Sequence, residues 1–377
     1  MTQLTKRTLT ITAALAALAL AAPSNAAPYY QGKTVTLIVG LGGGGGPDIM
    51  ARLLARHLPK HLEGSPKVIV KNMPGARFMK AHNFIFEKAK LDGLNFYYGP
   101  WFWGGDVIKT PGHRFKYKDF TMVGALRTSG RLQWMRTDVV PGGAKNWRDI
   151  FKVKNLRFAS TGSTTGFAMQ GLLGMDLLGL KYKFISGYRG SSKVRIAMRN
   201  NEANSMVDST HSYRFNTVRS MIKPGKGIPL WYFPYVDDKG NVLKSKTLPE
   251  FISLPDAYKE IHGKEISGPK WDLLKLGMRL ARLSHLVLGP PNMNKAATAA
   301  MSKGVWAALN SKPYQNEAKK SVTFYPTPVR IKTARTTVAS LANISPTLLE
   351  SLKAFDAQAN HIKVRSKSGK KRGGKKK

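Results

Sequence analysis

The residues best suited to ligand chemistry form a run of glycines that ends in Pro and Asp: Gly42, Gly43, Gly44, Gly45, Gly46, Pro47 and Asp48. Ordering each glycine costs extra conformational entropy, and an ordinary turn needs only one or two of them. Without Cβ atoms, such a loop lets a ligand approach the main chain, and its amides can bind negative charge together with the N-terminus of a following helix. Pro and Asp are typical of a first helical turn. The segment therefore predicts an anion-binding loop.

Two nucleotide-binding interpretations of this loop fail on its neighbours. A Walker loop requires Gly-Lys-Ser/Thr after the glycines, and Pro-Asp stands there instead. A dinucleotide fingerprint is formally matched by Gly40, Gly42 and Gly45, but any polyglycine matches it. The next predicted strand ends in Lys71 and Asn72, where an acidic residue would hold the ribose.

Two later segments offer matching polar groups at predicted strand-to-helix junctions. The first contains Ser160, Thr161, Gly162, Ser163, Thr164 and Thr165, and the second contains Tyr188, Arg189 and Gly190. Capping a helix needs one hydroxyl, so the five in the first segment favour contact with a carboxylate. Arg189 can bind a carboxylate bidentately, and it is equally consistent with a surface charge. Asp208 either accepts hydrogen bonds from a ligand or ordered water or caps its own loop.

Signals for catalysis or metal binding are weak. Ser163 lies in GSTTG rather than in a G-x-S-x-G nucleophile elbow, and His211 has no identifiable acid partner. The chain has no Cys and 8 His without metal-ligand spacing. Trp101 and Trp103 either cover a cleft or pack between domains. We expect neither an enzyme nor a bound metal or cofactor.

The order of predicted strands and helices indicates that an α/β fold positions these loops. Residues 33–39 predict a strand, and the helix after the glycines places Met50, Leu53 and Leu54 on one apolar face. Further strands are predicted at 67–72 and 94–99, with a helix at 80–89 between them. The alternation returns after residue 155, so we expect two doubly wound units with parallel sheets, joined by the apolar stretch 121–135. Loops at the carboxyl ends of such strands hold ligands.

The ends of the chain and its charge bear on location and partners. Lys6 and Arg7 precede an apolar run that ends in a small-residue site at Ala26, which predicts a signal peptide at residues 1–26 and export to the periplasm; a membrane anchor would need a longer run. The formal charge is +40, and removing the nine basic residues of the predicted disordered tail, 363–377, still leaves +31. Such a charge favours anionic ligands, polyanions or anionic membrane surfaces.

The ordered set of motifs resembles the substrate-binding proteins of tripartite tricarboxylate transporters, the TctC or Bug family. The resemblance begins with GKTVTLIVGLGGGGGPDIMARLLARHLPKHL and VIVKNMPGA and continues through FASTGSTTG, GYRGSSKVRIAMRNNEANSMVDS, LPEFISLPDA and LVLGPPNMNK. It covers nearly the whole chain after residue 26. Arg77 and Phe78 depart from the small residues of the family pattern and predict a narrower or more cationic cleft mouth.

This resemblance implies a two-lobed periplasmic receptor of the Venus-flytrap type that closes on a small carboxylate. The expected first lobe comprises residues 27–130 and 285–362, and the second comprises 131–284. The implied partners are a small organic acid and the membrane subunits of a transporter. The alternative is a basic interaction protein with the same fold that binds polyanionic surfaces and has no role in transport.

Overall fold

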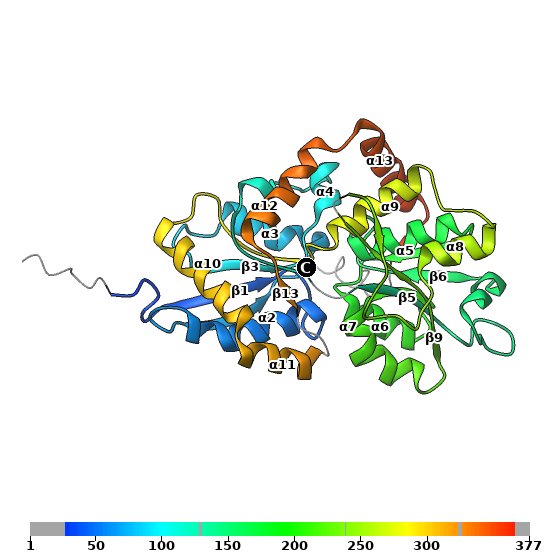
Figure 1. Ribbon diagram of the computed structural model, residues 1–377, viewed down its shortest axis with the longest axis horizontal. Helices are drawn as coiled ribbons and strands as arrows, with labels where there is room; N and C mark the ends of the chain where they lie inside the picture. The colour runs from blue at the N-terminus through cyan, green and yellow to red at the C-terminus, as the bar shows by residue number, and fades with distance from the viewer. Residues whose placement is uncertain (1–26, 128–129, 238, 323–325, 366–377) are drawn as a thin grey trace, which may run out of the picture.

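Two six-stranded sheets, each flanked by helices, form the two lobes of the computed structural model (Figure 1). The structure describes residues 27–127, 130–237, 239–322 and 326–365. The predicted signal peptide and residues 366–377 of the predicted tail lie outside the described residues. Within those ranges, no helix has both the length and the apolar composition that a membrane span requires.

The first sheet has the strand order β13-β4-β12-β3-β1-β2. Its strands are β1 (Thr34–Val39), β2 (Lys67–Asn72), β3 (Asn95–Gly99), β4 (Thr121–Arg127), β12 (His285–Gly289) and β13 (Thr327–Pro328). β1 pairs parallel with β2 and β3, whereas β12 pairs antiparallel with both β3 and β4. The β-branched sequence TVTLIV forms β1, whose last three residues are all buried.

The second sheet has the order β14-β7-β6-β8-β5-β9. Its strands are β5 (Arg131–Arg136), β6 (Leu156–Ala159), β7 (Tyr182–Ser186), β8 (Ser205–Ser209), β9 (Gly227–Phe233) and β14 (Lys363–Arg365). β5 pairs antiparallel with β8 and β9, and a small separate hairpin joins β10 (Tyr235–Val236) to β11 (Val242–Leu243). The prediction of parallel sheets was therefore wrong: both sheets are mixed, because β12 and β5, which each enter a lobe after a crossing, run antiparallel to their neighbours.

Helices cover the faces of both sheets (Figure 1). The α-helices are α2 (Gly46–His57), α3 (Met79–Glu87), α4 (Trp103–Val107), α5 (Gly166–Leu177), α6 (Ser191–Arg199), α7 (Thr210–Ser212), α8 (Leu254–His262), α9 (Pro269–Leu280), α10 (Lys295–Asn310), α11 (Lys312–Val322), α12 (Ile331–Ala339) and α13 (Pro346–His361). The 3-10 helices are η1 (Leu58–His61), η2 (Ala76–Phe78), η3 (Tyr117–Asp119), η4 (Trp147–Lys152) and η6 (Ser340–Asn343), and η5 (Tyr213–Ile222) is a π-helix. The main buried apolar cluster runs through both lobes.

The C-terminal segment corrects the expected lobe boundaries. We expected residues up to 362 in the first lobe and a disordered tail from 363. Instead, α13 packs on α9, which itself packs on α5 of the second lobe, and β14 then pairs parallel with β7. The chain therefore crosses between the sheets three times: after β4, before β12 and before β14.

Candidate functional site

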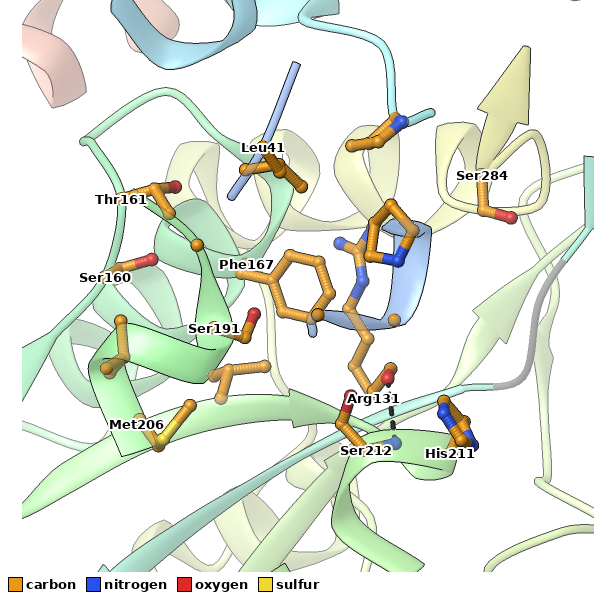
Figure 2. A pocket seen from close by; sticks show the side chains of 18 of the residues that line it. Leu41, Arg131, Ser160, Thr161, Phe167, Ser191, Met206, His211, Ser212 and Ser284 are labelled. Carbon is orange, nitrogen blue, oxygen red and sulfur yellow. Dashed lines mark hydrogen bonds between the residues drawn. The ribbon is translucent and has the colours of Figure 1, made fainter. Parts of the chain in front are cut away.

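A pocket lies between the two sheets, where the loops that follow β1, β3, β6, β7 and β8 converge. We call it the inner pocket (Figure 2). Its lining residues are Leu41, Gly42, Gly45, Gly46, Pro47, Met50, Phe78, Pro100, Arg131, Ala159, Ser160, Thr161, Phe167, Gly190, Ser191, Val194, Met206, Val207, Ser209, His211, Ser212, Ser284 and His285. Loops at the carboxyl ends of strands thus meet, as expected of ligand sites in α/β folds.

The glycine loop lies at this pocket, although not all of its residues line it. Gly42, Gly45, Gly46 and Pro47 contribute to the lining, whereas Gly43, Gly44 and Asp48 do not. The Gly42 amide donates to the Arg189 carbonyl at 3.0 Å, which joins the loops of the two lobes. Gly45, the N-cap of α2, makes no side-chain capping hydrogen bond. The positive N-terminal end of α2 is therefore not capped by a side chain and lies beside the pocket.

Asp48 folds the loop and does not line the inner pocket. It is 3% exposed and accepts hydrogen bonds from the Gly44 amide at 2.9 Å, from the Asn72 amide at 2.9 Å and from Arg52. Burial alone would raise its pKa, but these hydrogen bonds and the charge of Arg52 outweigh burial and lower the pKa of Asp48. Its carboxylate is therefore already satisfied, and we assign it a structural role.

The Ser/Thr loop is divided between pocket and scaffold. Ser160 and Thr161 line the inner pocket. Thr165 donates to the Gly162 carbonyl at 2.8 Å, Ser163 donates to the Asp356 carboxylate of α13 at 2.5 Å, and Thr164 accepts from Arg77 at 3.1 Å. Most of the hydroxyls that suggested ligand contact thus hold the loop, the lobes and the C-terminal helix together.

An outer chamber adjoins the inner pocket and shares Leu41, Phe78 and Thr161 with it. Its other lining residues are Gly40, Pro74, Gly75, Ala76, Arg77, Gly162, Ser186, Gly187, Tyr188 and Arg189. Of the predicted segment Tyr188-Arg189-Gly190, the first two residues line this chamber. The Tyr188 hydroxyl donates to Glu202 at 3.3 Å. Only Gly190 of that segment reaches the inner pocket.

The backbone at the outer chamber is strained. Three consecutive non-glycine residues, Ala76, Arg77 and Phe78, have φ of 45°, 54° and 77°, a left-handed conformation that costs free energy at each residue. The buried ring of His82 supports this segment, since its Nδ1 lies 3.0 Å from the Phe78 carbonyl and its Nε2 lies 3.1 Å from the Tyr117 hydroxyl. Phe78, which stands where the family pattern has a small residue, therefore lies between the outer chamber and the inner pocket and lines both.

Asp208, predicted as a ligand contact, does not line the inner pocket. It is fully buried, and its carboxylate accepts from Arg195 at 2.9 Å, from the Trp134 indole at 3.2 Å and from the Thr217 hydroxyl at 2.7 Å. The Arg195 side chain is 7% exposed, so this is a buried ion pair. Three donors occupy the carboxylate, and it ties β8 to β5, α6 and η5.

Arg131, which sequence reasoning missed, supplies the positive charge of the inner pocket. It is the first residue of β5 and extends beside Phe167, with its guanidinium carbon 4.3 Å from that ring centroid (Figure 2). Its Nη1 donates to Gln170 at 3.2 Å, and burial lowers its pKa to about 10, so it stays protonated at neutral pH. Among the described residues it has no carboxylate partner. The sequence feature that could have indicated this site is an Arg as the first residue of an apolar strand.

Gly166, the first residue of α5, makes room for this side chain. A Cβ added there would lie 2.7 Å from Nη1 of Arg131, closer than real Cβ atoms approach their neighbours. The guanidinium therefore sits against the N-terminal end of α5, whose N-cap, Thr165, makes no side-chain capping bond. The positive guanidinium of Arg131 and the positive N-terminal end of α5 thus lie together, which favours binding of an anion there.

His285 is the second missed residue and is the first residue of β12. It is 7% exposed, and burial, followed by the nearby charge of Arg131, lowers its pKa to about 3. It is therefore neutral at physiological pH. Ser191, Ser209, Ser212 and Ser284 add hydroxyls to the same lining.

The described residues offer little for catalysis or metal binding. No group of three His, Cys, Asp or Glu within them is placed to hold a metal ion. Ser163 is engaged with Asp356, and no nucleophile-base pair involving it is present among the described contacts. Trp101 and Trp103 are 6% and 4% exposed, and Trp103 approaches Gly277 of α9, which agrees with packing between elements rather than cover of a cleft.

Comparisons with known proteins identify the fold. No family model matches the sequence, and no curated protein matches it. The periplasmic binding protein BugD has a similar structure, with 18% identity over 89% of this chain and 100% of that one and a TM-score of 0.63. MatC from Rhodopseudomonas palustris, solved with malate, has 17% identity over 88% and 99% of the chains and a TM-score of 0.59. Rpa4515 from R. palustris, solved with adipate, has 16% identity over 86% and 98% and a TM-score of 0.63.

These structures cover 88–89% of this chain and match the Bug and TctC resemblance of the sequence motifs. The expected two-lobed α/β architecture is confirmed. This chain has the fold of the periplasmic solute-binding proteins of the Bug and TctC type.

Proposed function

We propose that this chain is a non-enzymatic member of the TctC or Bug family that is exported to the periplasm and binds a small organic acid between its lobes. The observation that carries the proposal is the partly buried Arg131 guanidinium, which lines the interlobe pocket and makes no ion pair with a carboxylate among the described residues. A buried charge is costly unless a partner compensates it, and an organic acid would supply that partner.

The contacts between the lobes support a closing mechanism. Gly42 of the first lobe bonds to the Arg189 carbonyl of the second, and Arg77 donates to Thr164 across the same boundary. An acid that contacts Arg131 and the ends of α2 and α5 at once gains those contacts only when the lobes are together. Its differential affinity for the closed state therefore drives closure.

Isothermal titration of the chain against carboxylic acids tests this proposal, with mass spectrometry of any acid retained through purification. We expect saturable binding of at least one acid and its loss in Arg131→Met, which keeps most of the side-chain volume without the charge. Silence across linear, aromatic and hydroxy acids would contradict a receptor for organic acids.

The family role further suggests delivery of the acid to the membrane subunits of a tripartite tricarboxylate-type transporter. Crosslinking of the acid-loaded chain to membranes of cells that contain such subunits tests this step. Crosslinks that form equally with and without acid would contradict delivery, because a transporter must distinguish the closed receptor from the open one.

The net charge of +40 favours a second candidate, attachment to polyanions or anionic membranes. Binding of this kind depends on counterion release and falls steeply with salt. We expect elution from heparin to need high salt and to change when residues 366–377 are removed, with no change in acid affinity. Weak retention at low salt would contradict this candidate.

A further inference from the structure

The inner pocket carries a single fixed charge. Arg131 is the only Arg or Lys among its described lining residues, and no Asp or Glu lines it. Its two histidines are His211 and His285, and His285 is neutral above its lowered pKa of about 3. Apart from His211, Arg131 is therefore the one described lining side chain that carries a charge at neutral pH.

Within the part of the chain that the structure describes, no carboxylate pairs with that guanidinium. The guanidinium of Arg131 contacts the amide of Gln170 and the ring of Phe167, both of which are neutral. Tyr235 also lies within electrostatic range, but burial raises its pKa to about 12, so the phenol is uncharged at neutral pH. The N-terminal end of α5 at Gly166 adds further positive potential. One negative charge on the ligand would balance the side-chain charge of the pocket.

The rest of the lining is largely apolar. Six lining side chains have no charge and no hydrogen-bonding group: Leu41, Met50, Phe78, Phe167, Val194 and Met206. Most of these are buried in the structure as it stands. A second carboxylate placed among them would lose its hydration without a counter-charge, which is strongly unfavourable in a site of low dielectric.

Other cationic side chains lie outside this space. Arg77 and Arg189 line the outer chamber, not the inner pocket, and Leu41 and Phe78 lie between the two. Arg77 already donates to Thr164. A short diacid held by Arg131 would therefore keep its second carboxylate in the apolar part of the inner pocket.

From this charge balance we infer that the ligand is a monocarboxylate with an apolar body, aliphatic or aromatic, and not a di- or tricarboxylate. The inference rests on the proposed function and narrows it. The carboxylate pairs with Arg131, and the body lies against Phe167, Phe78 and Met206. Hydroxyls of Ser160, Ser191 and Ser209 are available to a polar substituent on that body.

Titration calorimetry at pH 8, where ordinary histidines are neutral, separates the ligand classes with matched pairs: butanoate and succinate, hexanoate and adipate, benzoate and terephthalate. In the two aliphatic pairs a carboxylate replaces the terminal methyl group at constant chain length, and in the aromatic pair a second carboxylate is added to the ring. We expect the better monoacids to bind at least about tenfold more tightly than their diacid partners. Diacids that bind as tightly or more tightly overturn this inference and leave the proposed function standing, whereas no binding by any acid overturns both.

Variants locate the charge. Arg131→Met should weaken the best monoacid by about 30-fold or more, in line with the loss of a charge-assisted contact, while Arg131→Lys should retain part of the affinity. Gly166→Ala should also weaken binding, because its Cβ displaces the guanidinium. The matched control is Arg199→Met, which removes an exposed Arg at the end of α6 and should leave affinity unchanged. Unchanged affinity in a folded Arg131→Met overturns the inference.

Discussion

Replacement of Asp208 by Asn distinguishes a structural carboxylate from a ligand-binding one. In the wild type, the Asp208 carboxylate is fully buried and pairs with Arg195, whose side chain is 7% exposed. Asp208→Asn leaves the Arg195 charge buried without a counter-charge, and breaking a buried pair from one side costs about 3–5 kcal/mol. At about 2 °C per kcal/mol for a large domain, the melting temperature should fall by roughly 6–10 °C.

Urea unfolding followed by tryptophan fluorescence measures this loss, and Trp134, which donates to the same carboxylate, is a natural reporter. The double variant Asp208→Asn with Arg195→Met should be more stable than Asp208→Asn alone, because the orphaned charge is gone. Asp138→Asn is the control: the Asp138 side chain, which pairs with Arg136, is 54% exposed, and its loss should change stability by less than about 1 kcal/mol. Near-normal stability of Asp208→Asn together with lost acid binding would refute the structural assignment.

Three further perturbations address closure, the C-terminal segment and pH. Arg77→Gln weakens the contact with Thr164 across the lobes, so the dissociation rate of bound acid in stopped flow should rise several-fold; an unchanged rate would show that this contact does not hold the closed state. Asp356→Asn weakens the bond from Ser163 by about 1.5–3 kcal/mol and should lower the urea midpoint, and an unchanged midpoint would argue against α13 as a clamp. Burial lowers the pKa of His82 to about 3 from 6.5, so the unfolded chain gains a proton first as pH falls: stability is complete above pH 6.5 and should decline below it by up to about 1.4 kcal/mol per pH unit. Because burial also lowers the pKa of His285 to about 3, His82→Gln should remove about half of the slope that the two histidines give between pH 6.5 and 4.5, and an equal slope in both proteins would exclude His82 as a source.

Local features of the fold could be read from the sequence because they depend on neighbouring residues. The strand, glycine loop and helix expected at residues 33–58 are β1, the loop and α2 in the structure. β-branched residues favour the strand, and a Pro in the first turn favours the helix that follows. The expected strands at 67–72 and 94–99 also match β2 and β3.

The roles of the acidic residues could not be read in this way. Asp48 and Asp208 both stand where a ligand contact was plausible, yet each is occupied by donors of the scaffold. For Asp208, the decisive donors are Trp134 and Arg195, which come from a separate strand and a separate helix. Whether a carboxylate is free for a ligand depends on which donors the fold brings to it.

Three features follow from the sequence alone: the strand-loop-helix units, the glycine loop that leaves main-chain amides accessible to a ligand, and the convergence of loops between two lobes. Only the tertiary structure decided that Arg131 and His285, the first residues of β5 and β12, face the same pocket. Each follows a crossing from one sheet to the other, and sequence periodicity carries no information on where a crossing ends. These crossings bring Arg131 and His285, which are far apart in the chain, to the boundary between the sheets, and Arg131 gives the pocket its positive charge.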